Sequence, residues 1–343
     1  MRLVNLRLYF KYRTIDFNKN SMFIKTFTFL ILFISFNSIV YSQTKKIMPQ
    51  HLKKGDTVAI LATARKIDAS TLQPGIKLLE SWGLKVILGK TIGKEQNQLA
   101  GADWQRATDF QEMLDNPSVK AIWAAKGGYG TVKIVDRVDF SNFKKNPKWI
   151  IGFSDVTVLH SHMNRMGFQT LHAMMAISAP SATTAAKESL RKVLFGEKLS
   201  YSVPHHEFNK LGQAKGELVG GNLSVLYSIQ GSVSEVDFKD KILFVEDLDE
   251  YLYHIDRMMT NLKRNGSLKN LKGIIVGGMT SMNDNDVPWG KNALEIIQET
   301  VKELNIPVAY NFPAGHIKDN RALILGGIIS FEVTEKETKV VFE

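Results

Sequence analysis

The sequence contains no cysteine among its 343 residues. This absence excludes disulfide bonds, thiolate metal ligands, a cysteine nucleophile and the lipidated cysteine of a bacterial lipoprotein. Any covalent catalysis must therefore use an oxygen or a nitrogen nucleophile.

The sequence also lacks a basic run with interleaved aromatic residues, so we expect no nucleic-acid partner. The formal net charge is +10, but residues 1–42 hold six Lys or Arg and one Asp, which leaves about +5 for the remainder. Such a balance suits an anionic wall polymer or indicates no particular partner. A composition with 44% hydrophobic and 23% charged residues is typical of a globular protein.

Long apolar runs are scarce, and the one strongly biased segment, Phe27 to Val40, follows a basic stretch. A membrane-spanning helix needs about 20 apolar residues, so this shorter run predicts a signal peptide, residues 1–42, cleaved after Ser42. Met22 is an alternative start, and an uncleaved anchor is the competing interpretation. We expect an exported protein, periplasmic or extracellular, without stable membrane insertion after cleavage.

From Asp56 onward, short apolar runs alternate with amphipathic stretches, which predicts an α/β protein of two domains. Residues 46–180 are predicted to form an open parallel-sheet domain of the flavodoxin-like kind. A linker is expected at residues 181–210, and a mixed α/β domain at residues 211–343. The strands expected in the first domain are 58–62, 86–88, 121–125 and 149–153; those expected in the second are 216–218, 242–245, 273–276, 308–310, 322–325 and 339–342.

The segment Gly152-Phe153-Ser154-Asp155 places a serine between a predicted strand and a predicted helix. This order exposes a hydroxyl at the carboxyl edge of a parallel sheet and directs the N-terminal amides of the helix at the group it attacks. Residue 156 is Val, so the segment departs from the G-x-S-x-G pattern. A plain helix N-cap is the competing interpretation.

A second turn, Gly127-Gly128-Tyr129-Gly130, also follows a predicted strand. A loop with few side chains can present backbone N–H groups to an oxyanion. It lacks both the glycine spacing of a dinucleotide site and the Gly-Lys-Ser/Thr of a phosphate loop. An ordinary turn is the alternative.

Two carboxylates, Glu246 and Asp247, end a predicted buried strand, a position from which a carboxylate often orients a histidine. Charges that favour the following helix are the alternative explanation. His316 is the best candidate for a base, because it follows Pro and Gly in a loop and is poorly explained as a core residue. His160 and His162 are two positions apart on a predicted helix, so they cannot form the i, i+4 metal pair.

In combination, these segments resemble the LD-carboxypeptidase family, also called muramoyltetrapeptide carboxypeptidases. The resemblance spans roughly residues 47–340, and several blocks in one order are far more specific than any single motif. The blocks are Gly55-Asp56-Thr57, Lys126-Gly127-Gly128-Tyr129-Gly130, Gly152-Phe153-Ser154-Asp155, Gly220-Gly221-Asn222-Leu223-Ser224, Val245-Glu246-Asp247 and Gly315-His316.

The resemblance implies a catalytic triad of Ser154 as nucleophile, His316 as base and Glu246 as the partner of the base. It implies an oxyanion hole made by the backbone amides of Asp155 and Gly128. The site would lie between the two domains and would need no metal and no cofactor. The substrate-binding residues that it implies are Lys126, Tyr129 and Asn222.

The sequence departs from the family pattern at three places. Lys126 stands where the family usually has Arg, Ala62-Thr63-Ala64 where it often has Ala-Pro-Ser, and His172-Ala173-Met174 where it commonly has His-Gly-Pro. These departures concern specificity more than catalysis, because Lys keeps the charge of Arg but loses its bidentate grip on a carboxylate.

By resemblance, we expect a serine carboxypeptidase that releases D-alanine from muropeptide tetrapeptides by hydrolysing an L,D bond, and that forms a homodimer. One alternative is a related peptidase that cleaves a peptidyl nucleotide antibiotic and gives immunity. Another is a non-enzymatic periplasmic binding protein. Such a protein would have no reason to hold Ser154, Glu246 and His316 within reach of one another.

Overall fold

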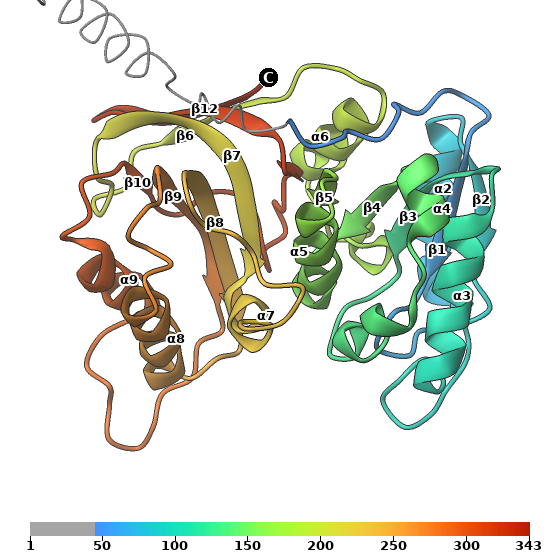
Figure 1. Cartoon of the computed structure of the whole chain (residues 1–343), viewed down its shortest axis with the longest axis horizontal. Helices are drawn as coiled ribbons and strands as arrows, with labels where there is room; N and C mark the ends of the chain where they lie inside the picture. Colours follow the sequence, from blue (N-terminus) through green and yellow to red (C-terminus); the bar gives the residue numbers. More distant parts are fainter. Residues whose placement is uncertain (1–44) are drawn as a thin grey trace, which may run out of the picture. The chain divides into compact units, whose positions relative to one another are not determined.

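The computed structural model describes residues 45–343, whose strands build two sheets (Figure 1). The predicted signal peptide, its cleavage after Ser42 and the alternative start at Met22 lie outside the described residues, so export stays a prediction. Within residues 45–343, no helix is both long enough and apolar enough to cross a membrane.

The first sheet has the strand order β2-β1-β3-β4-β5-β11. Its first five strands are parallel in the order 2-1-3-4-5, which is the flavodoxin-like order. The predicted fold class is therefore confirmed for this part of the chain. The bounds are β1 (Thr57–Leu61), β2 (Lys85–Leu88), β3 (Val119–Ala124), β4 (Trp149–Gly152), β5 (Thr170–His172) and β11 (Leu323–Leu325).

Helices cover both faces of this sheet, because successive side chains of a strand point to opposite sides. In β1, Val58 and Ile60 pack in a cluster with residues of α2 and α6, whereas Ala59 and Leu61 pack with residues of α3 and α5. All four side chains are fully buried, as in a central parallel strand. The helices are α2 (Gln73–Ser81), α3 (Asp103–Asp115), α4 (Ser141–Lys145), α5 (Thr157–Arg165) and α6 (Thr184–Leu194).

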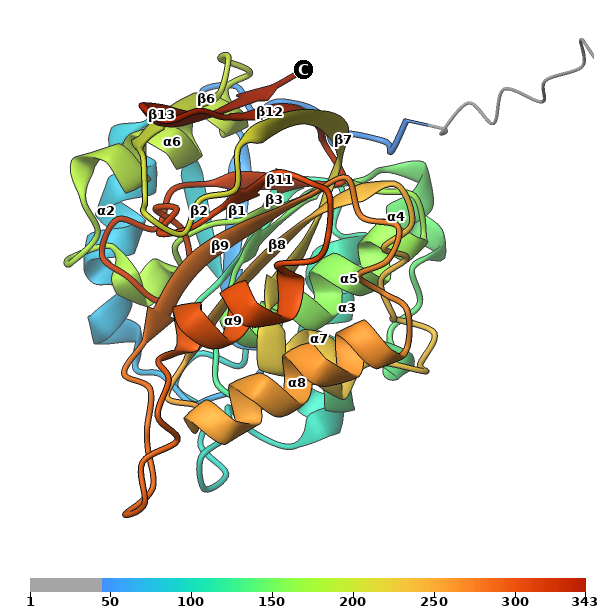
Figure 2. The same cartoon turned by 90° about the vertical axis from the view of Figure 1, so that its left-hand side faces the viewer.

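The second sheet has the order β10-β9-β8-β7-β12-β13-β6, with β7 to β10 parallel and β12, β13 and β6 antiparallel. Helices α8 and α9 lie side by side over one face (Figure 2). The bounds are β6 (Ser200–Pro204), β7 (Gly212–Asn222), β8 (Lys241–Leu248), β9 (Gly273–Thr280), β10 (Val308–Ala309), β12 (Ile328–Val333), β13 (Glu337–Phe342), α7 (Leu223–Ser228), α8 (Leu252–Arg264) and α9 (Ala293–Val301).

The two sheets do not follow the predicted domain boundaries, residues 181–210, in two respects. The expected linker, residues 181–210, contains α6 and the edge strand β6. The strand expected at residues 322–325 forms β11, but it belongs to the first sheet, where it pairs antiparallel with β5. Without a neighbour, the edge strand β5 would leave backbone N–H and C=O groups unpaired. The strand β11, from the second half of the chain, pairs with β5 and completes the first sheet.

Candidate active site

β4 ends at Gly152, and Phe153 follows it. Ser154 then begins a single 3₁₀ turn, Ser154–Val156, which precedes α5. Its φ is +62°, a left-handed conformation that is uncommon for any residue other than glycine. The N-cap interpretation of Ser154 is wrong, because Phe153 and Val156 occupy the positions before the two helical segments. A strained serine between strand and helix is the geometry of a nucleophile elbow.

The glycine loop faces this serine. A Cβ atom added to Gly127 would lie 3.3 Å from both Cβ and Oγ of Ser154. Gly128 has a φ of +120°, and a Cβ atom there would lie 2.4 Å from Cγ of Arg65. Glycine is therefore needed at position 128 both for the backbone conformation and for the close approach of the arginine.

Both predicted oxyanion amides are unoccupied donors. Within residues 45–343, neither the backbone N–H of Asp155 nor that of Gly128 donates to a protein acceptor. Unpaired N–H groups beside a serine hydroxyl are what an oxyanion hole requires. Both amides are therefore free to donate to a ligand.

Buried polar side chains hold the loop in this position. Arg106 is fully buried and donates to the carbonyl oxygens of Gly130, at 3.0 Å, and of Thr63. The Asp155 carboxylate accepts hydrogen bonds from the Thr131 N–H at 2.9 Å and from the Thr131 hydroxyl at 2.6 Å. The turn that carries Ser154 and the glycine loop are thus joined through one carboxylate.

The pKa of the Asp155 carboxyl is raised above its ordinary value because burial disfavours its charge. The hydrogen bonds from Thr131 act in the opposite direction.

Glu246 and His316 form a hydrogen-bonded pair near the end of β8. The Glu246 Oε2 atom accepts the Nδ1–H of His316 at 2.6 Å and the backbone N–H of the same residue at 3.1 Å. The side chain of Glu246 is fully buried, whereas that of His316 is 13% exposed. Gly315 makes this contact sterically accessible, because a Cβ atom there would lie 2.7 Å from Glu246.

The Glu246 bond assigns the proton of neutral His316 to Nδ1 and leaves Nε2 as an acceptor. Burial by itself lowers the pKa of His316, but the hydrogen bond to Glu246 and the charges of Glu246 and Asp247 outweigh it and raise the pKa. A neutral imidazole with a free Nε2 and a raised pKa is suited to act as a general base.

The imidazole of His316 lies beside the serine elbow. Its ring centroid is 4.7 Å from that of Phe153, the residue before Ser154. No hydrogen bond joins the Ser154 hydroxyl to His316 within the described part of the chain. The structure thus pairs Glu246 with His316 and places the imidazole beside Phe153, the residue next to Ser154.

The predicted substrate-binding residues occupy different surroundings. Asn222 is 4% exposed, and its amide bonds within the chain, to Val225 N–H at 3.1 Å and to Asp247 at 2.8 Å. Tyr129 is 62% exposed, with the ammonium group of Lys133 5.3 Å from its ring centroid. Lys126 is half-buried in the glycine loop. Tyr129 and Lys126 are accessible to a ligand, whereas Asn222 caps α7.

Asp247, the residue after Glu246 in β8, is also buried. Burial, followed by the charge of Glu246, raises its pKa to about 7. Its carboxyl also accepts the backbone N–H of Ser224 at 2.8 Å. Asp247 therefore helps to raise the pKa of His316 and bonds to the backbone at the start of α7.

A group of buried polar atoms near the pair was not predicted from the sequence. Glu246 Oε1, both ring nitrogens of His172 and Nδ2 of Asn320 have no hydrogen-bond partner among the described residues. Asn320 accepts the N–H of Gly315 at 2.9 Å, and the His172 ring lies 5.8 Å from that of Phe153. Burial, with the charges of His160 and His316, holds the pKa of His172 well below its ordinary value. The only signal in the sequence was the His172-Ala173-Met174 departure.

His160 is a core histidine. Its ring nitrogens form hydrogen bonds with the Thr170 hydroxyl and the Gly152 carbonyl, both at 2.9 Å, and so connect α5 to the ends of β4 and β5. Within residues 45–343, no group of three or more His, Asp or Glu side chains could hold a metal ion.

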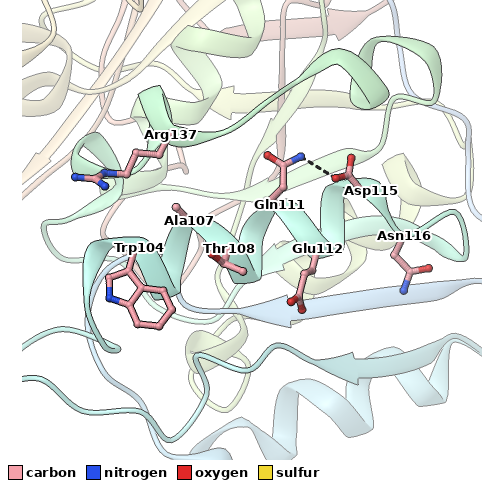
Figure 3. A pocket seen from close by; sticks show the side chains of 8 residues that line it. All are labelled: Trp104, Ala107, Thr108, Gln111, Glu112, Asp115, Asn116 and Arg137. Carbon is pink, nitrogen blue, oxygen red and sulfur yellow. Dashed lines mark hydrogen bonds between the residues drawn. The ribbon is translucent and has the colours of Figure 1, made fainter.

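A surface hollow of about 630 Å³ lies along α3 (Figure 3). Trp104, Gln111 and Asp115 of the helix line it together with Arg137, and Gln111 bonds to Asp115 at 2.9 Å. None of its lining residues is a predicted site residue. This hollow is therefore separate from the serine turn.

Family models match both halves of the chain: the LD-carboxypeptidase N-terminal domain over residues 58–173 and the LD-carboxypeptidase C-terminal domain over residues 215–331. The chain is 36% identical over 299 residues to the probable murein peptide carboxypeptidase of Bacillus subtilis (strain 168), covering 84% of this chain and 92% of that protein. It is 25% identical over 336 residues to the microcin C7 self-immunity protein MccF of Escherichia coli, covering 87% and 96%.

The crystal structure of muramoyltetrapeptide carboxypeptidase from Oxalobacter formigenes matches with a TM-score of 0.77 at 26% identity, over 83% of this chain and 98% of that one. Fold and matches together define a two-domain α/β peptidase. The chain belongs to the LD-carboxypeptidase family, as the resemblance of its motifs predicts.

Proposed function

We propose that this protein is a serine LD-carboxypeptidase that releases a C-terminal D-alanine from muropeptide tetrapeptides. The observation that carries the proposal is the 2.6 Å bond between the buried Glu246 carboxylate and His316, beside the strained Ser154. A binding protein has no use for a strained serine next to an oriented histidine.

In the proposed mechanism, Nε2 of His316 takes the hydroxyl proton of Ser154 as the oxygen attacks the carbonyl carbon before the terminal residue. The backbone N–H groups of Asp155 and Gly128 stabilise the negative charge on the carbonyl oxygen. His316 then gives the proton to the leaving amine, and the C–N bond breaks. Water hydrolyses the resulting acyl-enzyme with the same base, which restores the serine hydroxyl.

The substrate class comes from the relatives whose names contain murein peptide and muramoyltetrapeptide. A peptidyl nucleotide antibiotic is the second candidate, because the microcin C7 self-immunity protein aligns over 87% of this chain. Both candidates use the same serine chemistry on a different acyl group.

The first experiment measures D-alanine release from purified muropeptide tetrapeptide by the wild type and by Ser154→Ala. We expect release by the wild type and a loss of at least about 10³-fold in the variant, because no other nucleophile can replace the hydroxyl. The melting temperature of the variant checks that its fold persists. Equal rates in both proteins would rule out Ser154 as the nucleophile, and release only from a peptidyl nucleotide would favour the second candidate.

A further inference from the structure

Arg65 lies across the glycine loop. It follows β1, and its backbone N–H donates to the Gly127 carbonyl at 3.4 Å. Its side chain covers Gly128 so closely that an added Cβ atom would lie 2.4 Å from its Cγ, 2.6 Å from its Cδ and 2.9 Å from its Nε. The aliphatic stem of Arg65 therefore packs on the residue that supplies a proposed oxyanion amide.

The guanidinium group of Arg65 is available to a ligand. Arg65 is exposed, and among residues 45–343 its side chain makes no ion pair and no hydrogen bond. The second arginine at this loop, Arg106, is instead buried, and its donors serve Gly101, Thr63, Gly130 and Asp103. One arginine therefore holds the loop, while the side chain of the other has all its donors free among residues 45–343.

Ser154 and Arg65 contact neighbouring residues of the same loop, Gly127 and Gly128. Neighbouring Cα atoms are about 3.8 Å apart. In a peptide cut before its last residue, the terminal carboxylate is likewise only one residue beyond the attacked carbonyl. A cation that binds this carboxylate must therefore lie about one residue away from the nucleophile, and Arg65 packs on the loop residue next to the one that faces Ser154.

We infer that Arg65 forms the subsite for the terminal α-carboxylate of the leaving residue; this inference rests on the proposed carboxypeptidase function. The planar guanidinium fork matches a carboxylate with two parallel hydrogen bonds. Glycine at position 128 is required for this placement of the Arg65 guanidinium, since any larger residue there would displace the aliphatic part of the arginine side chain. Half-buried Lys126, in the same loop, adds a second positive charge.

The test compares two synthetic tetrapeptides that differ only at the C-terminus, one with a free carboxylate and one with an amide. Release of D-alanine or D-alaninamide is measured for the full-length wild type, Arg65→Gln and Arg65→Lys. Lys133→Gln, which removes a cation next to Tyr129 in the segment that follows the loop, is the matched control.

We expect Arg65→Gln to raise KM for the free acid about 10- to 100-fold, the usual worth of a charged hydrogen-bond pair, with little change in kcat or in cleavage of the amide. Arg65→Lys should restore part of the preference, and Lys133→Gln should retain all of it. A wild type without preference for the acid, or an Arg65→Gln variant that keeps the preference, would overturn the inference and leave the carboxypeptidase intact. Failure of the wild type to cleave either peptide would instead overturn the proposed function.

Discussion

At the residue scale, the chemistry depends on how one buried carboxylate acts on one histidine. Glu246 bonds to both the ring and the backbone of His316, so it sets the orientation, the tautomer and the pKa of the imidazole together. In the proposed mechanism, the neutral form of His316 is the base. Activity should therefore rise with pH through a pKa above the ordinary histidine value.

We predict that Glu246→Gln lowers kcat/KM by about 10²- to 10⁴-fold, because the amide cannot stabilise the imidazolium. The midpoint of the acid limb should also move to lower pH, since the bond and charge that raise the His316 pKa are lost while burial still lowers it. The measurement is kcat/KM for D-alanine release as a function of pH.

Glu250→Gln is the matched control for this prediction. Glu250 pairs with His254 at 2.5 Å outside the proposed site, so its loss should leave the activity unchanged. An acid limb that stays in place in Glu246→Gln would argue against Glu246 as the partner of the base.

At the scale of elements, the site depends on the tie between the serine turn and the glycine loop. The Thr131 hydroxyl donates to Asp155 at 2.6 Å and lies 2.8 Å from the Thr63 hydroxyl, so it links the turn, the loop and the segment after β1. Oxyanion donors are effective only when they are held in position before the reaction. In the proposed mechanism, the positions of these three segments are therefore part of the catalytic geometry.

We predict that Thr131→Val lowers kcat about tenfold or more with a smaller change in KM, because the loop amides lose their support. The free energy of unfolding should fall by about 1–3 kcal/mol, since buried Asp155 loses a donor. Steady-state kinetics and urea unfolding measure the two effects. Thr260→Val, which removes a hydroxyl-to-Asp256 bond at 3.2 Å on the exposed face of α8, should change neither. Equal losses in both variants would contradict the argument.

At the scale of the whole molecule, one hydrophobic cluster joins the two sheets. It contains Val58 and Trp123 of the first sheet together with Phe244 and Phe331 of the second. The strand β11 extends the first sheet with residues from the second half of the chain. The described part of the chain should therefore unfold as one cooperative unit.

We predict a single calorimetric transition that Phe331→Ala shifts as a whole to lower temperature. Phe331 is 1% exposed, and such truncations cost about 3–5 kcal/mol. Val287→Ala, at a side chain that is 83% exposed, should leave the transition unchanged. Two separate transitions, with only one of them moved by Phe331→Ala, would show that the sheets unfold independently.

Much of this architecture follows from local pattern. The alternation of apolar runs and amphipathic stretches predicts the parallel strands β1 to β4. Burial on both faces imposes the continuous apolar runs of β1, β3 and β4. The loop and the serine turn are predicted by two local motifs, Gly127-Gly128-Tyr129-Gly130 and Gly152-Phe153-Ser154-Asp155. Each motif is recognisable because its glycines directly follow or end a predicted strand. The order of these blocks gives the family, which the comparisons show.

Other features are decided only in the folded chain. The pairing of β11 with β5, the bond from Gly315 to Asn320 beside His172, and the packing of Arg65 on Gly128 join residues with no common local pattern. A sequence pattern reports which face of an element is apolar, but it does not report which distant segment will cover that face. The sequence by itself therefore determined most of the elements, the serine turn and the family. The tertiary structure decided which charges surround the serine, because electrostatic contacts depend on distances that only the packing of both sheets sets.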